Sequence, residues 1–302
     1  DESSPIHVSI DQFYGIEIND FAVTVAKTAL WIAESQMMKE TEDIVHMNLD
    51  FLPLTTNAFI VEGNSLQIDW ESVVPKYEVS YIMGNPPFVG YSLQSKEQKK
   101  DIISVYVDEK GKTYKMAGKI DYVSGWYFKA AQFMQGTMIR AAFVSTNSIT
   151  QGEQVAGVWK PLYKRFGIHI DFAYRTFRWD SEASLKAHVH CVIIGFSVAH
   201  NLSKRKIYVG DRIQEVENIN AYLIDAPNVF IESIGKPISD VPIMRSGGKP
   251  VEGGNFIFTE EEKNKFLKIE PRAGKFFRPF MGSEDYICLL YTSDAADEED
   301  SV

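Results

Sequence analysis

The sequence predicts an α/β fold, in which a sheet is covered by helices on both faces, followed by the start of a β-rich domain. Up to Ser197, short apolar runs of strand length alternate with longer helical stretches, which is typical of α/β proteins. Beyond that point the alternation weakens, and the pairs Gly247-Gly248 and Gly253-Gly254 mark turns in a segment that we expect to be β-rich.

Length and composition limit the number of domains and the class of protein. The chain has 302 residues, enough for one large domain and part of a second. An apolar content of 45% and an aromatic content of 13% can fill a substantial core. No apolar run approaches the roughly 20 residues of a membrane span. The two cysteines, Cys191 and Cys288, form no disulfide framework, which fits the reducing cytoplasm of a bacterium or archaeon.

The net charge of −10 argues against binding nucleic acid through bulk charge. Five of the carboxylates lie in residues 288–302, which contain no Lys or Arg, and removing them leaves −5. The string Cys-Leu-Leu-Tyr-Thr-Ser-Asp-Ala-Ala-Asp-Glu in this tail resembles translated sequencing adaptor, so we interpret 288–302 as non-native. The alternative is a genuine acidic tail. Because the chain begins with Asp and regular structure follows almost at once, we expect an internal fragment.

The first elements are a buried strand over residues 12–18 and a largely buried helix over residues 21–39. Asn19 or Asp20 can cap that helix. Glu17 therefore stands at the end of a strand, directly before a helix. In nucleotide-binding α/β folds an acid at this place accepts hydrogen bonds from ribose hydroxyls. The alternative is an acid that caps the helix.

Two further strands end in polar residues. A short strand over residues 59–61 leads to Asn64, and a strand over residues 77–83 leads to Asn85. For Asn64 the alternative is an Asx turn, which asparagine favours. Polar groups from three strand ends then meet at one edge, where open α/β sheets bind ligands.

The string Asn85-Pro86-Pro87-Phe88 predicts a stiff corner after the third strand. Each proline fixes its own φ and pushes the preceding residue toward extended geometry. The Asn85 side chain and the Pro86 carbonyl are two acceptors that can hold both hydrogens of an exocyclic amine on a nucleobase and localise its lone pair. The Phe88 ring can stack on that base. The alternative is a double-proline strand terminator.

The segment over residues 89–119 has a local net charge of +3, with seven lysines against four acids. The lysines are Lys96, Lys99, Lys100, Lys110, Lys112, Lys115 and Lys119. Such a stretch can follow a phosphate backbone, and the alternative is a solvated loop and helix.

The remaining elements follow from apolar periodicity. We expect strands over residues 138–145, 168–174, 188–197, 206–209 and 221–224. We expect helices over residues 121–135 and 152–166, the second interrupted near Pro161. The aromatic side chains of the first of these helices are interpreted as core.

His188, His190 and Cys191 are the only cluster that suggests a metal. The two histidines share one face of a strand, but no second ligand cluster is visible in the sequence. Because a closed zinc site needs four ligands, we interpret them as ordinary strand residues and expect no metal.

Three segments together resemble a known family. Residues 13–18 resemble motif II and residues 63–66 motif III of class I methyltransferases. Residues 81–90 resemble motif IV in the Asn-Pro-Pro-aromatic form of amino-group DNA methyltransferases. Their order resembles the MmeI-like methylase region of single-chain restriction–modification enzymes (type IIL within type IIG). The likeness extends to about residue 287, and residues 240–254 resemble the start of the target-recognition domain.

The resemblance implies a Rossmann-like class I methyltransferase sheet and a division of the chain into four segments. These are a methyltransferase domain (1–197), a connector (198–238), the start of a target-recognition domain (239–287) and the tail (288–302). It also implies S-adenosylmethionine as methyl donor and the N6 amine of a flipped adenine in duplex DNA as acceptor, since that amine is paired inside the helix.

The resemblance also assigns roles. Glu17 would hold the ribose hydroxyls, Ile18 would pack on the adenine of the cofactor, and Asn64, followed by Ser65, would read its polar edge. At the target, Asn85 and Pro86, followed by Pro87, would hold the amine, and Phe88 would stack on the base. Phe177 or Trp179 could cover the opposite face of that base, and core packing is the alternative for both.

One departure is that the Gly-rich motif I of the family should precede residue 12, and residues 1–11 do not supply it. We therefore expect this stretch alone to bind cofactor poorly. Two other functions stay open at this point: a protein-glutamine methyltransferase, which uses a similar corner on an amide, and a non-catalytic DNA-binding module of the same fold.

Overall fold

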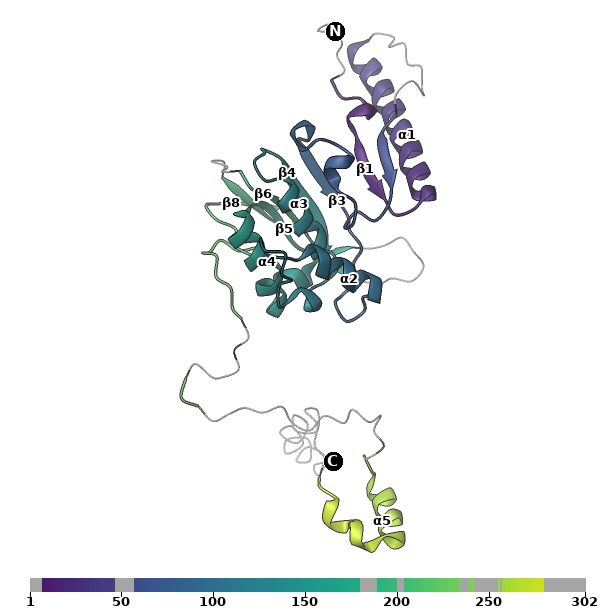
Figure 1. Ribbon diagram of the computed structural model, residues 1–302, viewed down its shortest axis with the longest axis vertical. Helices are drawn as coiled ribbons and strands as arrows, with labels where there is room; N and C mark the ends of the chain where they lie inside the picture. Colours follow the sequence, from purple (N-terminus) through teal and green to yellow (C-terminus); the bar gives the residue numbers. More distant parts are fainter. Residues whose placement is uncertain are drawn as a thin grey trace, which may run out of the picture. The chain divides into compact units, whose positions relative to one another are not determined.

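The computed structural model describes residues 7–46, 57–179, 189–199, 204–232, 234, 239–241, 255 and 257–279. The chain divides into two compact units, residues 1–233 and residues 234–302 (Figure 1). Within the described residues, no helix is both long enough and apolar enough to cross a membrane.

The first unit opens with a small parallel sheet. Strands β1 (Tyr14–Glu17) and β2 (Phe59–Glu62) pair so that Glu17 lies opposite Glu62. Helix α1 (Asp20–Val45) follows β1, and the Asn19 side chain accepts a hydrogen bond from the backbone N–H of Ala22 at 2.8 Å. The predicted cap at Asn19 is therefore confirmed.

The predicted burial of these first elements is wrong. Residues 10–12 form a 3-10 turn, the strand after it has four residues, and α1 has no buried residue among its 26. Phe21, on this helix, is 75% exposed. Apolar composition predicts burial only where other elements cover the helix, and the small sheet of β1 and β2 contacts one side of α1 without fully burying any of its residues.

The second sheet has six strands in the order β3-β4-β6-β5-β7-β8. The strands are β3 (Tyr81–Gly84), β4 (Arg140–Thr146), β5 (His169–Trp179), β6 (Val189–Ser197), β7 (Arg205–Val209) and β8 (Arg212–Val216). Strand β3 is parallel to β4, and β5 is parallel to β7. Strand β6 runs antiparallel between β4 and β5, and β7 and β8 form a hairpin. The prediction of an α/β fold is confirmed, and the sheet is mixed.

Two predicted elements need correction, and one strand was not predicted. The third strand begins at Tyr81, after a 3-10 turn over Lys76–Glu78. Residues 221–224 form a turn and not a strand, because the Asn220 side chain accepts from the backbone N–H groups of Tyr222 and Ile224. Strand β8 was not predicted.

Helix α4 (Gly152–Phe166) continues through Pro161, so the predicted interruption is wrong. A proline inside a helix removes one hydrogen bond and costs about 3 kcal/mol or more. Val158, Trp159 and Leu162 are each 0% exposed. Burying three such side chains stabilises this helix by a comparable amount or more.

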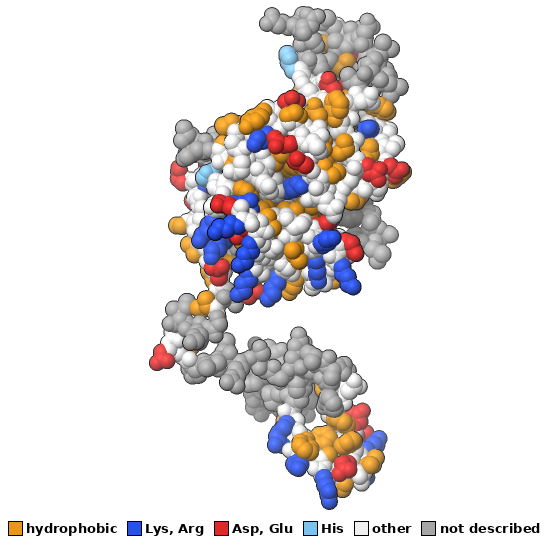
Figure 2. Space-filling view, viewed as in Figure 1, with side chains coloured by type: hydrophobic (Ala, Val, Ile, Leu, Met, Phe, Trp, Pro, Cys, Tyr) orange, Lys and Arg blue, Asp and Glu red, His pale blue; other side chains and the backbone are white. Residues whose placement is uncertain are grey.

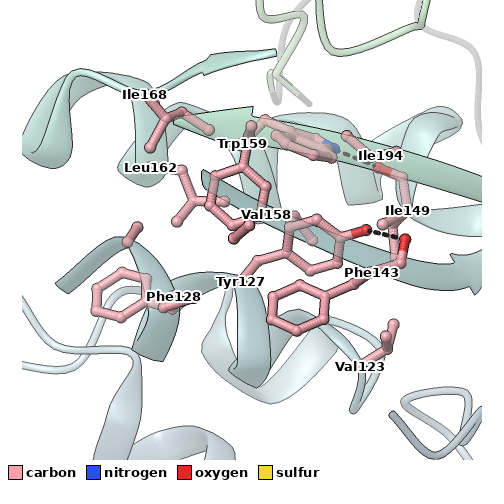
Figure 3. Packing of buried hydrophobic residues seen from close by; sticks show 14 of the residues in the cluster. Val123, Tyr127, Phe128, Phe143, Ile149, Val158, Trp159, Leu162, Ile168 and Ile194 are labelled. Atoms are coloured by element: carbon pink, nitrogen blue, oxygen red, sulfur yellow. Dashed lines mark hydrogen bonds between the residues drawn. The ribbon is translucent and has the colours of Figure 1, made fainter. Parts of the chain in front are cut away.

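Aromatic rings from α3 (Ser124–Phe133), α4 and the sheet form the centre of the core (Figure 3). The Tyr127 ring stacks on Phe196 with centroids 5.3 Å apart and meets Phe143 and Trp159 edge-on at 5.2 and 5.4 Å. The Tyr127 hydroxyl also shares a hydrogen bond with Ser145 near the end of β4, at 2.7 Å. The interpretation of the aromatic helix as core is confirmed. The hydrogen bond between Tyr127 and Ser145 holds the end of β4 against this helix.

In the second unit, helix α5 (Glu260–Ile269) is followed by a 3-10 segment over Pro271–Phe276. Thr259 and Glu262 form a capping box at the start of α5. This pattern is visible in the sequence as Thr-x-x-Glu, and our expectation of a β-rich segment overlooked it. The described part of this segment is helical, while the predicted glycine turns at 247–248 and 253–254 and the tail at 288–302 lie outside the described residues.

Candidate active site at the end of strand β3

The Asn85–Phe88 corner follows β3 without a break and has no regular secondary structure. Strand β3 pairs in parallel with β4, with Gly84 opposite Phe143. The corner therefore lies at the carboxyl end of both strands, which is the edge where α/β sheets bind ligands.

The corner presents its two acceptors. The Asn85 side chain is exposed, and within the described residues neither it nor the Pro86 carbonyl takes part in a hydrogen bond. Pro86 is buried, Pro87 is exposed and Phe88 is half-buried. Both oxygens thus lack a hydrogen-bond partner among the described residues and lie next to an aromatic ring.

Two backbone groups beyond the corner are hydrogen-bonded to residues just before α3. The backbone N–H of Tyr122 donates to the carbonyl of Val89 at 2.9 Å. The backbone N–H of Tyr91 donates to the Asp121 carboxylate at 3.0 Å. The exit of the corner is therefore fixed to the start of a buried helix.

The predicted cofactor residues Glu17 and Ile18 lie at the end of β1. The Glu17 carbonyl accepts from the backbone N–H of Gly63 at 2.7 Å, so the ends of β1 and β2 are adjacent. The Glu17 side chain is half-buried, and its carboxylate has no hydrogen-bond partner among the described residues. It does not cap α1, because Asn19 does. Ile18 is 64% exposed.

Asn64 and Ser65 lie in the turn that follows β2. The Asn64 side chain donates to Asp101 at 2.8 Å and accepts from the backbone N–H of Leu66 at 3.0 Å, so the Asx-turn alternative is present in the structure. The Ser65 carbonyl accepts from the Trp70 indole at 2.9 Å. The Asn64 side chain therefore already helps to hold its own turn, whatever else it binds.

Gly63 begins this turn in a conformation that favours glycine, with φ at 154°. A Cβ atom at Gly63 would lie 2.2 Å from the Cδ1 atom of Ile68. Only glycine therefore allows the chain to turn so sharply from β2.

Asp101, on helix α2 (Lys96–Val105), is a residue that sequence analysis missed. It is 4% exposed, and its carboxylate accepts from the Gln67 side chain at 2.7 Å and the Tyr122 hydroxyl at 2.9 Å, besides Asn64. Burial, followed by the hydrogen bond to Asp101, raises the pKa of the Tyr122 hydroxyl. Asp101 lies one helical turn from the apolar Val105, and this spacing was the available signal that both residues share the buried face of the helix.

The predicted site residues thus form two groups. Glu17, Ile18, Asn64 and Ser65 lie at the ends of β1 and β2, and residues 85–88 lie at the end of β3. Asp101 and the adjacent pair Asp121 and Tyr122 connect the groups through hydrogen bonds.

Other predicted residues lie apart from these groups. His190 is exposed and Cys191 is buried, while His188 lies outside the described residues. The described residues contain no group of three or more His, Cys, Asp or Glu that could hold a metal ion. Phe177 is on β5 opposite Cys191, and the Trp179 side chain lies outside the described part.

All seven lysines of residues 89–119 are exposed. Figure 2 shows Lys and Arg side chains gathered over the region of α2 and α4. Exposure agrees with a solvated surface, and contact with a phosphate backbone stays a prediction.

A shallow cavity of about 570 Å³ lies between Lys76, Tyr81 and Arg140, at the amino ends of β3 and β4. It is therefore at the opposite end of these strands from the corner. The chemistry suggested by the corner does not need this cavity.

Two family models match the sequence. The model of the MmeI DNA-methyltransferase domain matches residues 2–209, and the model of the MmeI target recognition domain matches residues 225–290. DNA methyltransferase A of Bacillus subtilis (strain 168) is 41% identical over 283 residues, which are 93% of this chain and 32% of that protein. The solved type IIL restriction-modification enzyme MmeI in complex with DNA is 43% identical, with a TM-score of 0.81. That match covers 93% of this chain and 38% of the solved one, so the chain spans about a third of the length of these relatives.

Proposed function

We propose that this chain, which belongs to the MmeI family of DNA methyltransferases, methylates the N6 amine of adenine within a restriction–modification enzyme. The observation that carries the proposal is the pair of free acceptors, the Asn85 side chain and the Pro86 carbonyl, at the carboxyl end of β3. The 43% identity to MmeI supports the same class of enzyme.

The corner can overcome the main chemical difficulty of the reaction, which is the weak nucleophilicity of the adenine amine. The lone pair of an adenine amine is delocalised into the ring, which makes the nitrogen a poor nucleophile. Asn85 and the Pro86 carbonyl can accept the two amine hydrogens, localise the lone pair and stabilise the positive charge that develops on nitrogen. Phe88 can stack on the base after it has left the duplex. The proton can leave for solvent after the new bond forms, so the corner needs no strong base.

S-adenosylmethionine is the proposed methyl donor, and it supplies an electrophilic methyl carbon on a sulfonium. The residues at the ends of β1 and β2 fit it. Glu17 has a half-buried carboxylate without a partner among the described residues, which can accept from two ribose hydroxyls. Ile18 offers an exposed apolar side chain beside it. The Asn64 oxygen accepts one hydrogen bond and keeps a second lone pair, and Ser65 follows it in the same turn.

Duplex DNA with a flipped adenine is the proposed partner. We keep residues 1–197 as the methyltransferase domain, 198–238 as a connector and 239–287 as the start of the target-recognition domain. The two family models, which end at residue 209 and begin at residue 225, support this order. The model that matches residues 2–209 is that of a DNA-methyltransferase domain, so a protein-glutamine methyltransferase is not favoured.

Product analysis tests the proposal. The full-length protein is incubated with unmethylated plasmid DNA and S-adenosylmethionine labelled in the methyl group, and the digested nucleosides are identified by mass spectrometry. We expect N6-methyldeoxyadenosine. Label on cytosine, or on protein in place of DNA, overturns the assignment.

A further inference from the structure

Asp121 is a buried acid that the chemistry above does not use. It lies three residues before the first residue of α3, is 6% exposed, and each of its carboxylate oxygens accepts a hydrogen bond. One accepts from the backbone N–H of Tyr91 at 3.0 Å, and the other accepts from the hydroxyl of Ser148. Its own backbone N–H donates to the Gln154 side chain at 3.1 Å.

These two bonds reach the ends of two neighbouring strands. Tyr91 comes three residues after Phe88, in the segment that leaves the corner. Ser148 lies in the turn after β4 and also shares a hydrogen bond with Thr146, the last residue of that strand, at 2.8 Å. Asp121 therefore connects the exit of the corner to the end of the strand beside it.

Neighbouring contacts hold the same segment. The Gln94 side chain, 9% exposed, donates to the carbonyl of Ile120 at 2.9 Å. The backbone N–H of Tyr122 donates to the carbonyl of Val89. Residues 89–94 thus lie along residues 120–122 through three hydrogen bonds, and Asp121 supplies the central one.

We propose that Asp121 is a positioning residue for methyl transfer, which fixes the corner by holding Tyr91 and Ser148. The inference rests on the proposed function. Because a shift of about 1 Å in a reacting group can cost on the order of 100-fold in rate, a corner released at its exit turns over slowly. We assign Asp121 no contact with substrate, because it is 6% exposed and each of its oxygens accepts a hydrogen bond from the protein.

The test compares three variants of the full-length protein. Asp121→Ala removes both acceptors and is expected to lower kcat by roughly 10- to 100-fold. Asp121→Asn restores most of the rate, because its oxygen can still accept from Tyr91 while its NH₂ group donates to Ser148. Ser124→Ala is the control, since Ser124 is 0% exposed and its hydroxyl has no partner among the described residues. It should keep the wild-type kcat.

Two readouts separate positioning from a general loss of structure. The Kd for S-adenosylmethionine should change less than about threefold in Asp121→Ala, because the residues at the ends of β1 and β2 are untouched. Hydrogen exchange at the Tyr91 amide should become faster in Asp121→Ala and stay slow in Asp121→Asn and Ser124→Ala.

A wild-type kcat in Asp121→Ala, or a loss confined to cofactor affinity, overturns the inference. If Asp121→Ala does not fold, Ser148→Ala takes its place: it should lower kcat by a smaller factor, and an unchanged kcat then counts against the proposal. A wild-type protein that methylates no DNA refutes the proposed function instead, and exchange at Tyr91 still tests the role of Asp121.

Discussion

The side-chain amide of Asn64 donates a hydrogen bond to the carboxylate of Asp101 at 2.8 Å, across 37 residues of sequence. The same carboxylate accepts from the hydroxyl of Tyr122, whose backbone N–H is bonded to the residue that follows the Asn85–Phe88 corner. The turn that we assign to the cofactor and the corner that we assign to the target are therefore joined through one buried acid.

Replacing Asp101 with alanine should destabilise the fold. Three donors, from Asn64, Gln67 and Tyr122, lose their acceptor. The Tyr122 hydroxyl is the buried one of the three, and an unsatisfied buried donor costs about 1–3 kcal/mol. We expect the free energy of unfolding in urea to fall by about 1–3 kcal/mol. Glu109→Ala, an exposed acid in the same segment, is the control and should change it by less than about 0.5 kcal/mol. If the two variants are equally stable, Asp101 does not stabilise the fold.

Glu17→Ala should weaken the binding of S-adenosylmethionine to the full-length protein. A hydrogen bond to a charged group contributes about 1.5–3 kcal/mol, which corresponds to roughly 10- to 100-fold in Kd. Glu62 lies opposite Glu17 on β2 and is exposed, so Glu62→Ala is the matched control. Titration calorimetry that gives the same affinity for both variants would exclude Glu17 from the cofactor site.

Phe88 should contribute to capture of the flipped base through stacking, which is worth about 1–3 kcal/mol per base. Phe88→Ala should therefore raise the KM for DNA, while Phe88→Trp, which keeps a flat ring, should stay near the wild-type value. The KM for S-adenosylmethionine should stay constant in both. Loss of activity in Phe88→Trp with full activity in Phe88→Ala would show that the ring has another role.

Alkaline pH should unfold the first unit. Tyr106 and Tyr127 are 0% exposed, and burial raises the pKa of both hydroxyls above the ordinary value of 10.0. Above that pH the unfolded chain releases protons that the folded chain keeps. The stability that these neutral hydroxyls contribute is complete below pH 10 and is lost as the pH rises, at up to about 1.4 kcal/mol per pH unit for each tyrosine.

The ionisation of the tyrosines can be followed by tyrosinate absorbance, and the unfolding of the first unit by circular dichroism. We expect the buried tyrosines to ionise only as the helical signal is lost. Ionisation of all 14 tyrosines near pH 10, with the helical signal intact, would contradict the burial.

Features that depend on adjacent residues could be predicted from the sequence. Two prolines in succession end β3 after Gly84, and Asn19 caps α1 through a donor three residues away. Both effects act within a few residues, so the local string contains the information.

Features that depend on distant partners could not be predicted. The donors of Asp101 and Asp121 lie 21 to 37 residues away, so the local sequence does not show which groups these acids bind. The continuation of α4 through Pro161 likewise depends on the packing of the whole helix against the core. The burial of α1 was predicted from its composition alone, but the contacts of α1 with β1 and β2 fully bury none of its residues.

The central claim is that Asn85 holds the target amine, and the kcat of Asn85→Ala in the full-length protein tests it most directly. Losing one preorganised polar partner costs roughly 100- to 1,000-fold in kcat, and we expect that loss while the Kd for S-adenosylmethionine stays nearly unchanged. Asn85→Asp should lose less, because a carboxylate oxygen also accepts hydrogen bonds. Formation of N6-methyladenine by Asn85→Ala at a rate near that of the wild type would contradict the account.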